Sequence, residues 1–492
     1  MQKVLFYHKL RKIYPCILFN SNIKSNLEYY GGDIEELCKK YNFLLKIFLS
    51  LISLITLLAI LKIKILLFLD IPLALLTYFY PLLYSWSKKE EFKKLINLEA
   101  PFISIVAYVN SIVDKSLVYT MKELSEIKEL KTPKIEFQLL DKMMKYMGFS
   151  TINAIEKRAE IHSGDLLGKL YNNYIAAINL GITVRDRLRD VLKDILFDLK
   201  ESYKGYVEKS AELAEVEFAV LLLLPIVLIG FAFTFKVSII ELLFPLVFIP
   251  PLLFVITTLQ PGINYEIKYG KILYGLVLIP LILILQVNVT YKIVSILTIL
   301  LILSYFTYQQ VSLANELEKS LPIILKELSV YLRIGYTVQN ALPKIRMNSK
   351  RVNKVLNDVI KNPEDISTPS KLFNMTMKLL FLLSKTGSSS NALEELGNAI
   401  AEILYSKESL MKQLRLYDAL VFLTPIMLWL SFTTLNKIIN SIIPEIDIIA
   451  LYTVGSALLL SKLSRFTILY FPTMVMITVI LIILSFIPPV FL

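Results

Sequence analysis

The chain has 492 residues, of which 55% are hydrophobic, and it carries a formal net charge of +12. Only 19% of the residues are charged, below the roughly 25% of soluble domains, which excludes an ordinary soluble protein. Apolar runs of about 20 residues predict helices that cross a bilayer. The excess of Lys and Arg is then typical of loops on the cytoplasmic side, and nucleic acid is not an expected partner.

The residue types that support catalysis or metal binding are scarce. His8 and His162 are the two histidines, too few for a zinc site or a histidine-based triad. Cys16 and Cys38 are expected to be reduced in the cytoplasm. The segment 164–169 has the pattern GxxxGK, one residue short of a phosphate-binding loop, which favours a helix cap instead. We therefore expect no enzyme activity, no catalytic residue, no metal and no cofactor.

Apolar runs in chain order predict about nine transmembrane helices. The first run, Leu45–Tyr84, is too long for one span, and Lys62–Lys64 divides it into a hairpin. The other predicted spans are Phe218–Phe235, Val237–Thr257, Ile272–Val287, Ile293–Tyr308, Leu420–Leu435, Ile448–Leu460 and Phe466–Ile487.

Two long stretches of ordinary soluble composition separate these spans. The predicted fold is all-α, a polytopic membrane protein with two repeated cytoplasmic helical-bundle domains. Its parts are an N-terminal cytoplasmic segment (1–43), a transmembrane hairpin (44–86), a first helical domain (87–217), four transmembrane helices (218–308), a second helical domain (309–416) and three C-terminal transmembrane helices (417–492).

The short loops set the expected orientation. The loops placed outside hold few charges, whereas nearly all other Lys and Arg lie in the segments placed inside, which include the N-terminal segment and the Tyr265–Lys271 loop. We expect the protein in the plasma membrane. The positive-inside rule then places the N-terminus and both large domains in the cytoplasm. An odd number of spans then places Leu492 outside.

The two large domains show an internal repeat. Pro101 and Pro322 each stand at the start of an apolar stretch with helical spacing, which predicts a proline in a first helical turn. Each stretch is followed by a break and a restart. In the second copy Gly335 is expected to end the helix and Thr337 to cap the next. In the first copy, Asp114 and Ser116 take these places.

A second break follows in each copy. Gly181 precedes Thr183, which is spaced to form a capping box with Asp186. In the other copy Gly387 precedes Asn391, the corresponding cap. From each break a charged helix leads into a span, one containing Leu224–Val227 and the other Thr424–Met427, both with proline second. The matching order predicts duplication of one helical unit.

The second copy resembles the type II secretion F domain, through the Pro322 helix, the segment Arg333–Leu342 and the segment Lys385–Gly387 leading to Leu393. The first copy matches less well, since Asp114 replaces the first glycine. This family supplies the membrane platform of type IV pilus, type II secretion and archaellum machines, and the extra spans are most similar to the archaeal members. The resemblance implies a hexameric secretion ATPase and pilin subunits as partners, and by analogy a homodimer.

Charged clusters in the two domains are the candidate ATPase contacts. The predicted partner-binding residues are Arg185, Arg187, Arg189, Lys193, Lys344, Arg346, Lys350 and Arg351. Complementary charge would steer docking to an acidic surface, and the alternatives are a solvated helix face or contact with anionic membrane lipids. Glu394 and Glu395 favour a helix N-terminal role.

Glu212, Glu215 and Glu217 precede a predicted span. They indicate either a water-exposed boundary face or a group that transmits ATPase motion into the membrane.

Two other functions stay open. A transporter would also have many spans, but the centres of the predicted spans are nearly free of charge. A membrane scaffold for signalling would carry a sensory or kinase module, and none is recognised. Which filament a platform would build, an archaellum, an adhesive pilus or a DNA-exchange pilus, does not follow from the sequence.

Overall fold

The computed structural model describes residues 21–61, 67–112, 114–231, 239–261, 265–268, 289–363, 366–385, 390–439 and 445–486, with isolated positions between 270 and 282. Within these ranges every regular element is helical, and the one β-type pairing is an isolated bridge between Tyr265 and Ser370. The prediction of an all-α fold is confirmed. The chain divides into two compact units, Met1–Ile195 and Leu196–Leu492, which are described separately.

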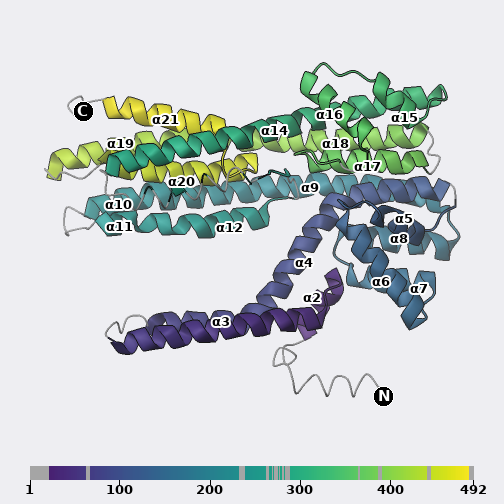
Figure 1. Ribbon diagram of the computed structural model, residues 1–492, viewed down its shortest axis with the longest axis horizontal. Helices are drawn as coiled ribbons and strands as arrows, with labels where there is room; N and C mark the ends of the chain where they lie inside the picture. Colours follow the sequence, from purple (N-terminus) through teal and green to yellow (C-terminus); the bar gives the residue numbers. More distant parts are fainter. Residues whose placement is uncertain are drawn as a thin grey trace. The chain divides into compact units, whose positions relative to one another are not determined.

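The first unit contains seven complete helices among its described residues (Figure 1). They are α2 (Ser21–Tyr30), α3 (Ile34–Leu61), α4 (Leu67–Ile112), α5 (Leu117–Ser125), α6 (Lys131–Met147), α7 (Thr151–Ile161) and α8 (Leu166–Leu180). Helix α9 (Val184–Phe218) begins in this unit and continues into the second. Helices α5 to α8 pack in sequence order, and α4 also contacts α5, α6 and α8.

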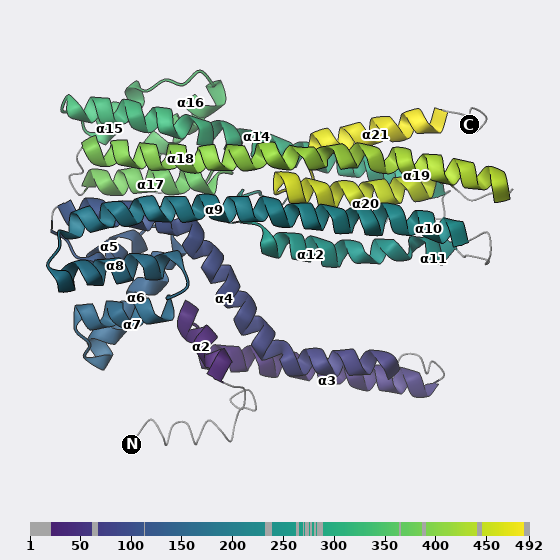
Figure 2. The same cartoon turned by 180° about the vertical axis from the view of Figure 1, so that it is seen from behind.

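The second unit begins with the rest of α9, the π-helical turn η3 (Ala219–Leu223), α10 (Leu224–Phe231), α11 (Ile239–Leu243), the 3-10 turn η4 (Phe244–Phe248) and α12 (Ile249–Leu259). It continues with α14 (Val289–Arg333), α15 (Val338–Ala341), η5 (Leu342–Lys344), α16 (Lys350–Lys361), α17 (Lys371–Lys385) and α18 (Ser390–Leu414). It ends with η6 (Arg415–Tyr417), α19 (Asp418–Ile439), α20 (Glu445–Arg465) and α21 (Phe471–Phe486). Figure 2 shows α14 and α18 running side by side, as their contacts also indicate.

Five helices among the described residues are long and apolar enough to cross a membrane. They are Tyr78–Ile112, Glu241–Leu259, Tyr291–Arg333, Leu393–Thr434 and Asp447–Arg465, and α21 is a shorter apolar helix. The apolar window of Asp447–Arg465 is 72% buried, whereas that of Glu241–Leu259 is 17% buried. Helix α20 therefore forms the centre of the apolar bundle and α12 its rim. These helices indicate a multi-pass membrane protein.

The count of about nine spans stays a prediction, because several predicted spans fall partly outside the described residues. The turn predicted at Lys62–Lys64 lies outside them, although α3 and α4 flank it. Most of the predicted span Ile272–Val287 also lies outside. The predicted span Val237–Thr257 is not one straight helix where it is described, because η4 interrupts it around Pro245. A proline there removes one backbone donor and favours the tighter turn.

Helices α4 and α14 have buried positions in common around their prolines. Counted from the two prolines, corresponding positions of the two helices are buried together. The buried positions are Ile96, Ala100, Ile103, Ser104 and Ala107 in α4, and Leu317, Leu321, Ile324, Leu325 and Leu328 in α14. Helix α14 is buried along one face, whereas α4 is buried on all sides from Glu99 to Ala107, so the repeat stays a prediction. In the second copy α18 approaches closely, since a Cβ added to Gly397 would lie 3.4 Å from Leu325 Cβ.

The expected position of the two prolines at helix starts is wrong. Pro101 lies deep inside α4 and Pro322 lies inside α14, so both helices continue through the proline. An internal proline removes one backbone hydrogen bond and costs about 3 kcal/mol. The fully buried side chains on both sides of each proline offset this cost, because ending the helix would expose them.

The breaks after these helices have left-handed backbone conformations. Asp114 has φ +56° and Gly335 has φ +98°, at the same distance from their prolines. Ser116 accepts a hydrogen bond from the Tyr119 N–H at the start of α5. Thr337 occupies the matching position before α15, but its side chain makes no capping hydrogen bond.

The second pair of breaks is described in one copy. Gly181 ends α8 with φ +66°, and Thr183 directly precedes α9. Gly387 lies outside the described residues, and Asn391 lies within α18 rather than before it.

The expectation that both cysteines are reduced is wrong for Cys38. This residue lies in α3, is 1% exposed and is disulfide-bonded. Cys16 lies outside the described residues. Disulfides are rare in reducing compartments, although intracellular disulfides occur in hyperthermophiles, so this bond does not by itself decide the orientation.

Gly335→Ala tests the strain at the first break. No atom lies within 4 Å of an added Cβ, so the cost is conformational, about 1–2 kcal/mol for a left-handed residue. We expect a lower thermal unfolding midpoint in detergent. Asp114→Gly, at the matching position of the other copy, should leave the midpoint unchanged or raise it. Equal destabilisation by both variants would contradict the assignment of these two positions.

Candidate functional site

The first predicted cluster lies on the first turns of α9 and is exposed. Its cations, Arg185, Arg187, Arg189 and Lys193, alternate with Asp186, Asp190 and Asp194. Arg185 Nε lies 3.4 Å from Asp186 Oδ1, and Lys169 Nζ of α8 lies 3.8 Å from Asp194 Oδ2. The acidic residues offset most of the positive charge, so this surface is mixed rather than basic.

The second predicted cluster lies on η5, the following loop and α16. Lys344, Arg346, Lys350 and Arg351 are all exposed, and Lys354 of α16 extends the patch. One acidic contact is close, with Arg351 Nη1 3.6 Å from Glu316 Oε1.

Lys344 lies over the exposed Tyr336 ring, with its Nζ 3.7 Å from the ring centroid. The nearby ammonium lowers the pKa of Tyr336. Positive charge exceeds negative charge on this face, which makes it the stronger candidate for docking an acidic partner. The two clusters belong to different compact units.

Glu394 supports the second unit through an exposed ion pair. Its Oε2 lies 3.1 Å from Arg333 Nη2, which joins the start of α18 to the end of α14. An exposed pair of this kind stabilises by about 1 kcal/mol or less. Glu394 therefore contributes to the local structure and is not oriented into a site.

A buried polar network organises the first unit. Arg158 of α7 pairs with Glu136 of α6, and its guanidinium also donates to the Glu28 and Tyr29 carbonyls of α2. His162, which caps α7, lies 3.1 Å from Glu136 Oε1 and 2.7 Å from Asp165 Oδ2. The network ties α2, α6, α7 and α8 together.

Neighbouring charges outweigh desolvation in this network. Burial by itself would raise the pKa of Glu136, but Arg158 and His162 lower it to about 2. Burial would lower the pKa of His162, but hydrogen bonds to Asp165 and Glu136 raise it. The pKa of Asp165 is lowered by His162 against the effect of burial. Because these groups are packed tightly and paired, the network is a structural element.

A second buried pair joins α14 to α18. Lys407 Nζ lies 2.6 Å from Glu318 Oε2, and Ser370 Oγ donates to Glu318 Oε1 at 2.9 Å. The ammonium also lies 4.7 Å from the centroid of the Tyr265 ring, and the Tyr265 hydroxyl donates to Asn315. The loop at Tyr265 is thereby attached to the second helical domain.

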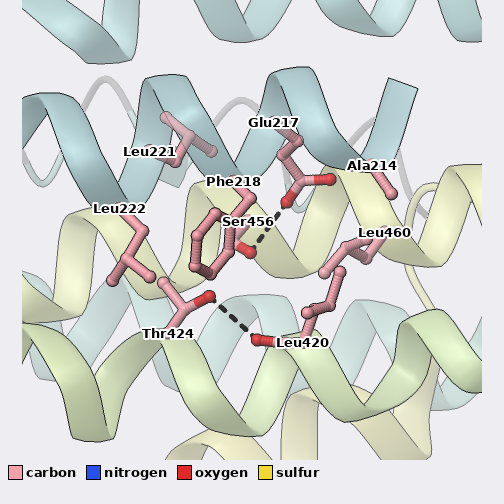
Figure 3. A pocket seen from close by; sticks show the side chains of 9 residues that line it. All are labelled: Ala214, Glu217, Phe218, Leu221, Leu222, Leu420, Thr424, Ser456 and Leu460. Carbon is pink, nitrogen blue, oxygen red and sulfur yellow. Dashed lines mark hydrogen bonds between the residues drawn. The ribbon is translucent and has the colours of Figure 1, made fainter. Parts of the chain in front are cut away.

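A third buried acid differs from these two because it is only partly satisfied. Glu217, at the end of α9, is 4% exposed. Its Oε1 accepts a hydrogen bond of 2.8 Å from Ser456 Oγ of α20. Its Oε2 has no hydrogen-bond partner among the described residues. Figure 3 shows the carboxyl group in a small cavity between α9, η3, α19 and α20.

The position of Glu217 corrects the interpretation of a water-exposed boundary face. Ser456 is nine residues before Arg465, the end of α20, so it lies about 14 Å along the helix from that end. Glu217 therefore packs at the middle of a helix long enough to span a membrane. Glu212 and Glu215 on the same helix are exposed.

No family model, curated protein or solved structure matches this chain.

The candidate sites therefore have to be judged on geometry. Among the described residues, no three His, Cys, Asp or Glu side chains are grouped as a metal site would require. Sequence reasoning predicted the exposed basic patch and a loop or cap position for His162, which caps α7, but missed the burial of Glu217 and the pairing of His162 with Glu136 and Asp165. The one sequence signal for Glu217 was its position directly before an apolar run. Its burial could not be predicted, because the helix that covers it lies more than 200 residues further along the chain.

The network in the first unit predicts a pH optimum for its stability. Because the pKa of His162 is raised in the folded protein, its stabilising effect is complete below pH 6.5 and is lost as the pH rises through the folded-state pKa. Because the pKa of Glu136 is lowered in the folded protein, its stabilising effect is complete above pH 4.5 and is lost as the pH falls toward about 2. We expect maximal protection of α6–α8 between these values in hydrogen exchange corrected for the intrinsic rate.

Two variants separate the limbs of this profile. His162→Gln should flatten the alkaline limb and Glu136→Gln the acid limb. An unchanged profile in both variants would show that other groups control it.

Proposed function

We propose that this chain is an integral membrane platform for assembly of a type IV pilus-like filament. It docks a cytoplasmic secretion ATPase and couples it to insertion of pilin subunits. The observation that carries the proposal is that continuous helices join the apolar segments to a helical domain outside them. Helix α14 runs from an apolar segment into the second helical domain without interruption. The helix Leu393–Thr434 passes from that domain back into an apolar segment.

This continuity supports a mechanical role. A movement imposed on the second helical domain would pass along α14 and α18 to α20 and α21, which they contact directly, and through η6 from α18 into α19. A helix keeps its length under such a displacement because its backbone hydrogen bonds lie along the axis. The motor itself would be a separate protein, the hexameric ATPase implied by the family resemblance.

The basic patch of η5 and α16 is the proposed ATPase contact. Its exposed cations exceed the nearby acids, and electrostatic complementarity speeds encounter and fixes orientation. The mixed cluster at the start of α9 is a weaker contact by the same argument. The two-domain layout with about nine spans, the cytoplasmic location of both domains and the external C-terminus belong to this proposal, supported by the short-loop charges.

The alternative is a polytopic transporter. Glu217 is the observation that favours it, because ionisable groups at membrane depth often mark ion or substrate pathways. The repeated helical domain outside the apolar segments has no role in that alternative, so the platform proposal accounts for more of the chain.

Charge reversal in the basic patch tests the proposal. The full-length tagged protein is purified from its native membrane in mild detergent, and the proteins recovered with it are identified. We expect an ATPase of the secretion type, reduced about tenfold by Lys344→Glu with Arg346→Glu, which corresponds to about 1.4 kcal/mol. Recovery of the ATPase with the wild-type protein should also fall as salt is raised, because salt screens the attraction between exposed charges.

The matched control reverses two exposed lysines of α14, Lys319→Glu with Lys326→Glu, which lie outside the patch, and should retain the ATPase. Reversal of Arg185 and Arg187 should have a smaller effect than reversal of the patch. Recovery of intact protein without any ATPase or pilin, even after crosslinking, would reject the platform proposal and favour the transporter.

A further inference from the structure

The cavity beside Glu217 presents hydrogen-bond acceptors and no free donor. Ser456 Oγ uses its hydrogen on Glu217 Oε1. Thr424 Oγ1 of α19 uses its hydrogen on the Leu420 carbonyl, at 2.8 Å (Figure 3). What stays available is Glu217 Oε2 and the lone pairs of the two hydroxyls. An acceptor-only site is complementary to a cation or to a proton.

The size of the cavity limits its occupant. It leaves about 10 Å³ for the centre of a water-sized sphere, which is room for about one water molecule or one ion of similar size. The rest of the lining is apolar and includes Ala214, Leu221, Leu222 and Leu460. An organic cation would not fit without movement of these side chains.

Electrostatics require the carboxyl group to be neutralised. An isolated carboxylate in an apolar environment is strongly unfavourable, and such groups bind a proton or a counter-ion instead. No basic side chain lines the cavity. Asp418, two residues before Leu420 in α19, is itself paired with Arg465 of α20 and accepts from Ser464. Glu212 and Glu215 of α9 are exposed, and η3 carries no charged residue.

We propose that Glu217, Ser456 and Thr424 form a membrane-embedded binding site for one small monovalent cation, either H⁺ or Na⁺. The occupant neutralises Glu217 and allows the end of α9 and η3 to pack against α19 and α20. Glu217 supplies the charge, and Ser456 holds one carboxyl oxygen so that the other is directed into the cavity. With H⁺, the carboxyl group is itself the binding group. With Na⁺, the free carboxylate oxygen supplies the charge, and the hydroxyl oxygens of Ser456 and Thr424 are the other polar groups of the cavity lining.

The local backbone is consistent with a built site. Directly after Glu217 the helix widens into the π-helical turn η3, which contributes Leu221 and Leu222 to the cavity wall. Single π-helical turns are rare within α-helices and occur frequently at functional sites. The π-helical turn contacts both α19 and α20, and α10 after it contacts α19.

Infrared difference spectroscopy of the full-length protein in lipid bilayers tests this site directly. With choline as the bulk cation at neutral pH, the wild type should show the carbonyl band of a protonated, buried carboxyl group. Glu217→Gln should remove the band, and Glu215→Gln, the exposed neighbour on the same helix, should retain it. Ser456→Ala should move the band to higher frequency, because the carbonyl oxygen loses its hydrogen bond.

Addition of Na⁺ then identifies the occupant. Persistence of the band assigns H⁺, whereas conversion to carboxylate bands by Na⁺, but not by K⁺, assigns Na⁺. Carboxylate bands from Glu217 in choline buffer would overturn the proposal, because the group would then stay ionised without either cation. If Glu217→Gln fails to fold, the Ser456→Ala shift still decides, and the absence of both the band and the shift contradicts the site.

Discussion

The unbroken helix α14 is the element on which the second unit depends. Five of its side chains, Leu317, Leu321, Ile324, Leu325 and Leu328, are fully buried along one face. This face packs mainly against α18, and contacts to α20 and α21 extend the interface toward the other end of the helix. Because the buried face continues through Pro322, the helix cannot end there without exposing apolar surface. The same helix therefore belongs both to the apolar bundle and to the second helical domain.

Three buried acids show how the chain treats charge in its interior. Glu136 is paired with Arg158 and His162, and Glu318 is paired with Lys407. Both acids have their oxygens satisfied, which is the usual condition of buried polar groups. Glu217 departs from this pattern, with one carboxyl oxygen directed at a cavity and without a partner. An exception of this kind requires an explanation, and an exchangeable cation supplies one that preserves the packing around it.

The sequence was sufficient for local features and insufficient for those set by distant packing. The φ > 0 positions at Asp114, Gly335 and Gly181 follow from residue type and spacing, because few residues tolerate that conformation. The predicted repeat rested on two prolines whose expected position at helix starts was wrong. That error has a physical cause, because the burial on both sides of a proline depends on α18, which proline chemistry does not reveal.

The burial of Glu217 could not be read for the same reason, since Ser456 is 239 residues away in sequence. The residues of the basic patch were predicted, but the sequence analysis did not predict that this patch has a larger excess of positive charge than the α9 cluster. That excess depends on how many acidic residues lie beside the cations. Arg351 has Glu316 beside it, whereas the α9 cations alternate with three aspartates. Counting only the basic residues made the two clusters look equivalent. The family resemblance stays a proposal that these structural features support.

The central claim is that both repeated helical domains face the cytoplasm, where an ATPase can reach them. Single cysteines placed at Lys350, Arg187 or Tyr291, in a chain whose Cys16 and Cys38 are replaced by Ser, test it with a membrane-impermeant thiol reagent. The account predicts that Arg187→Cys and Lys350→Cys react only after the cells are permeabilised, whereas Tyr291→Cys reacts in intact cells. Labelling of Lys350→Cys in intact cells would place the proposed ATPase contact outside and would contradict the account.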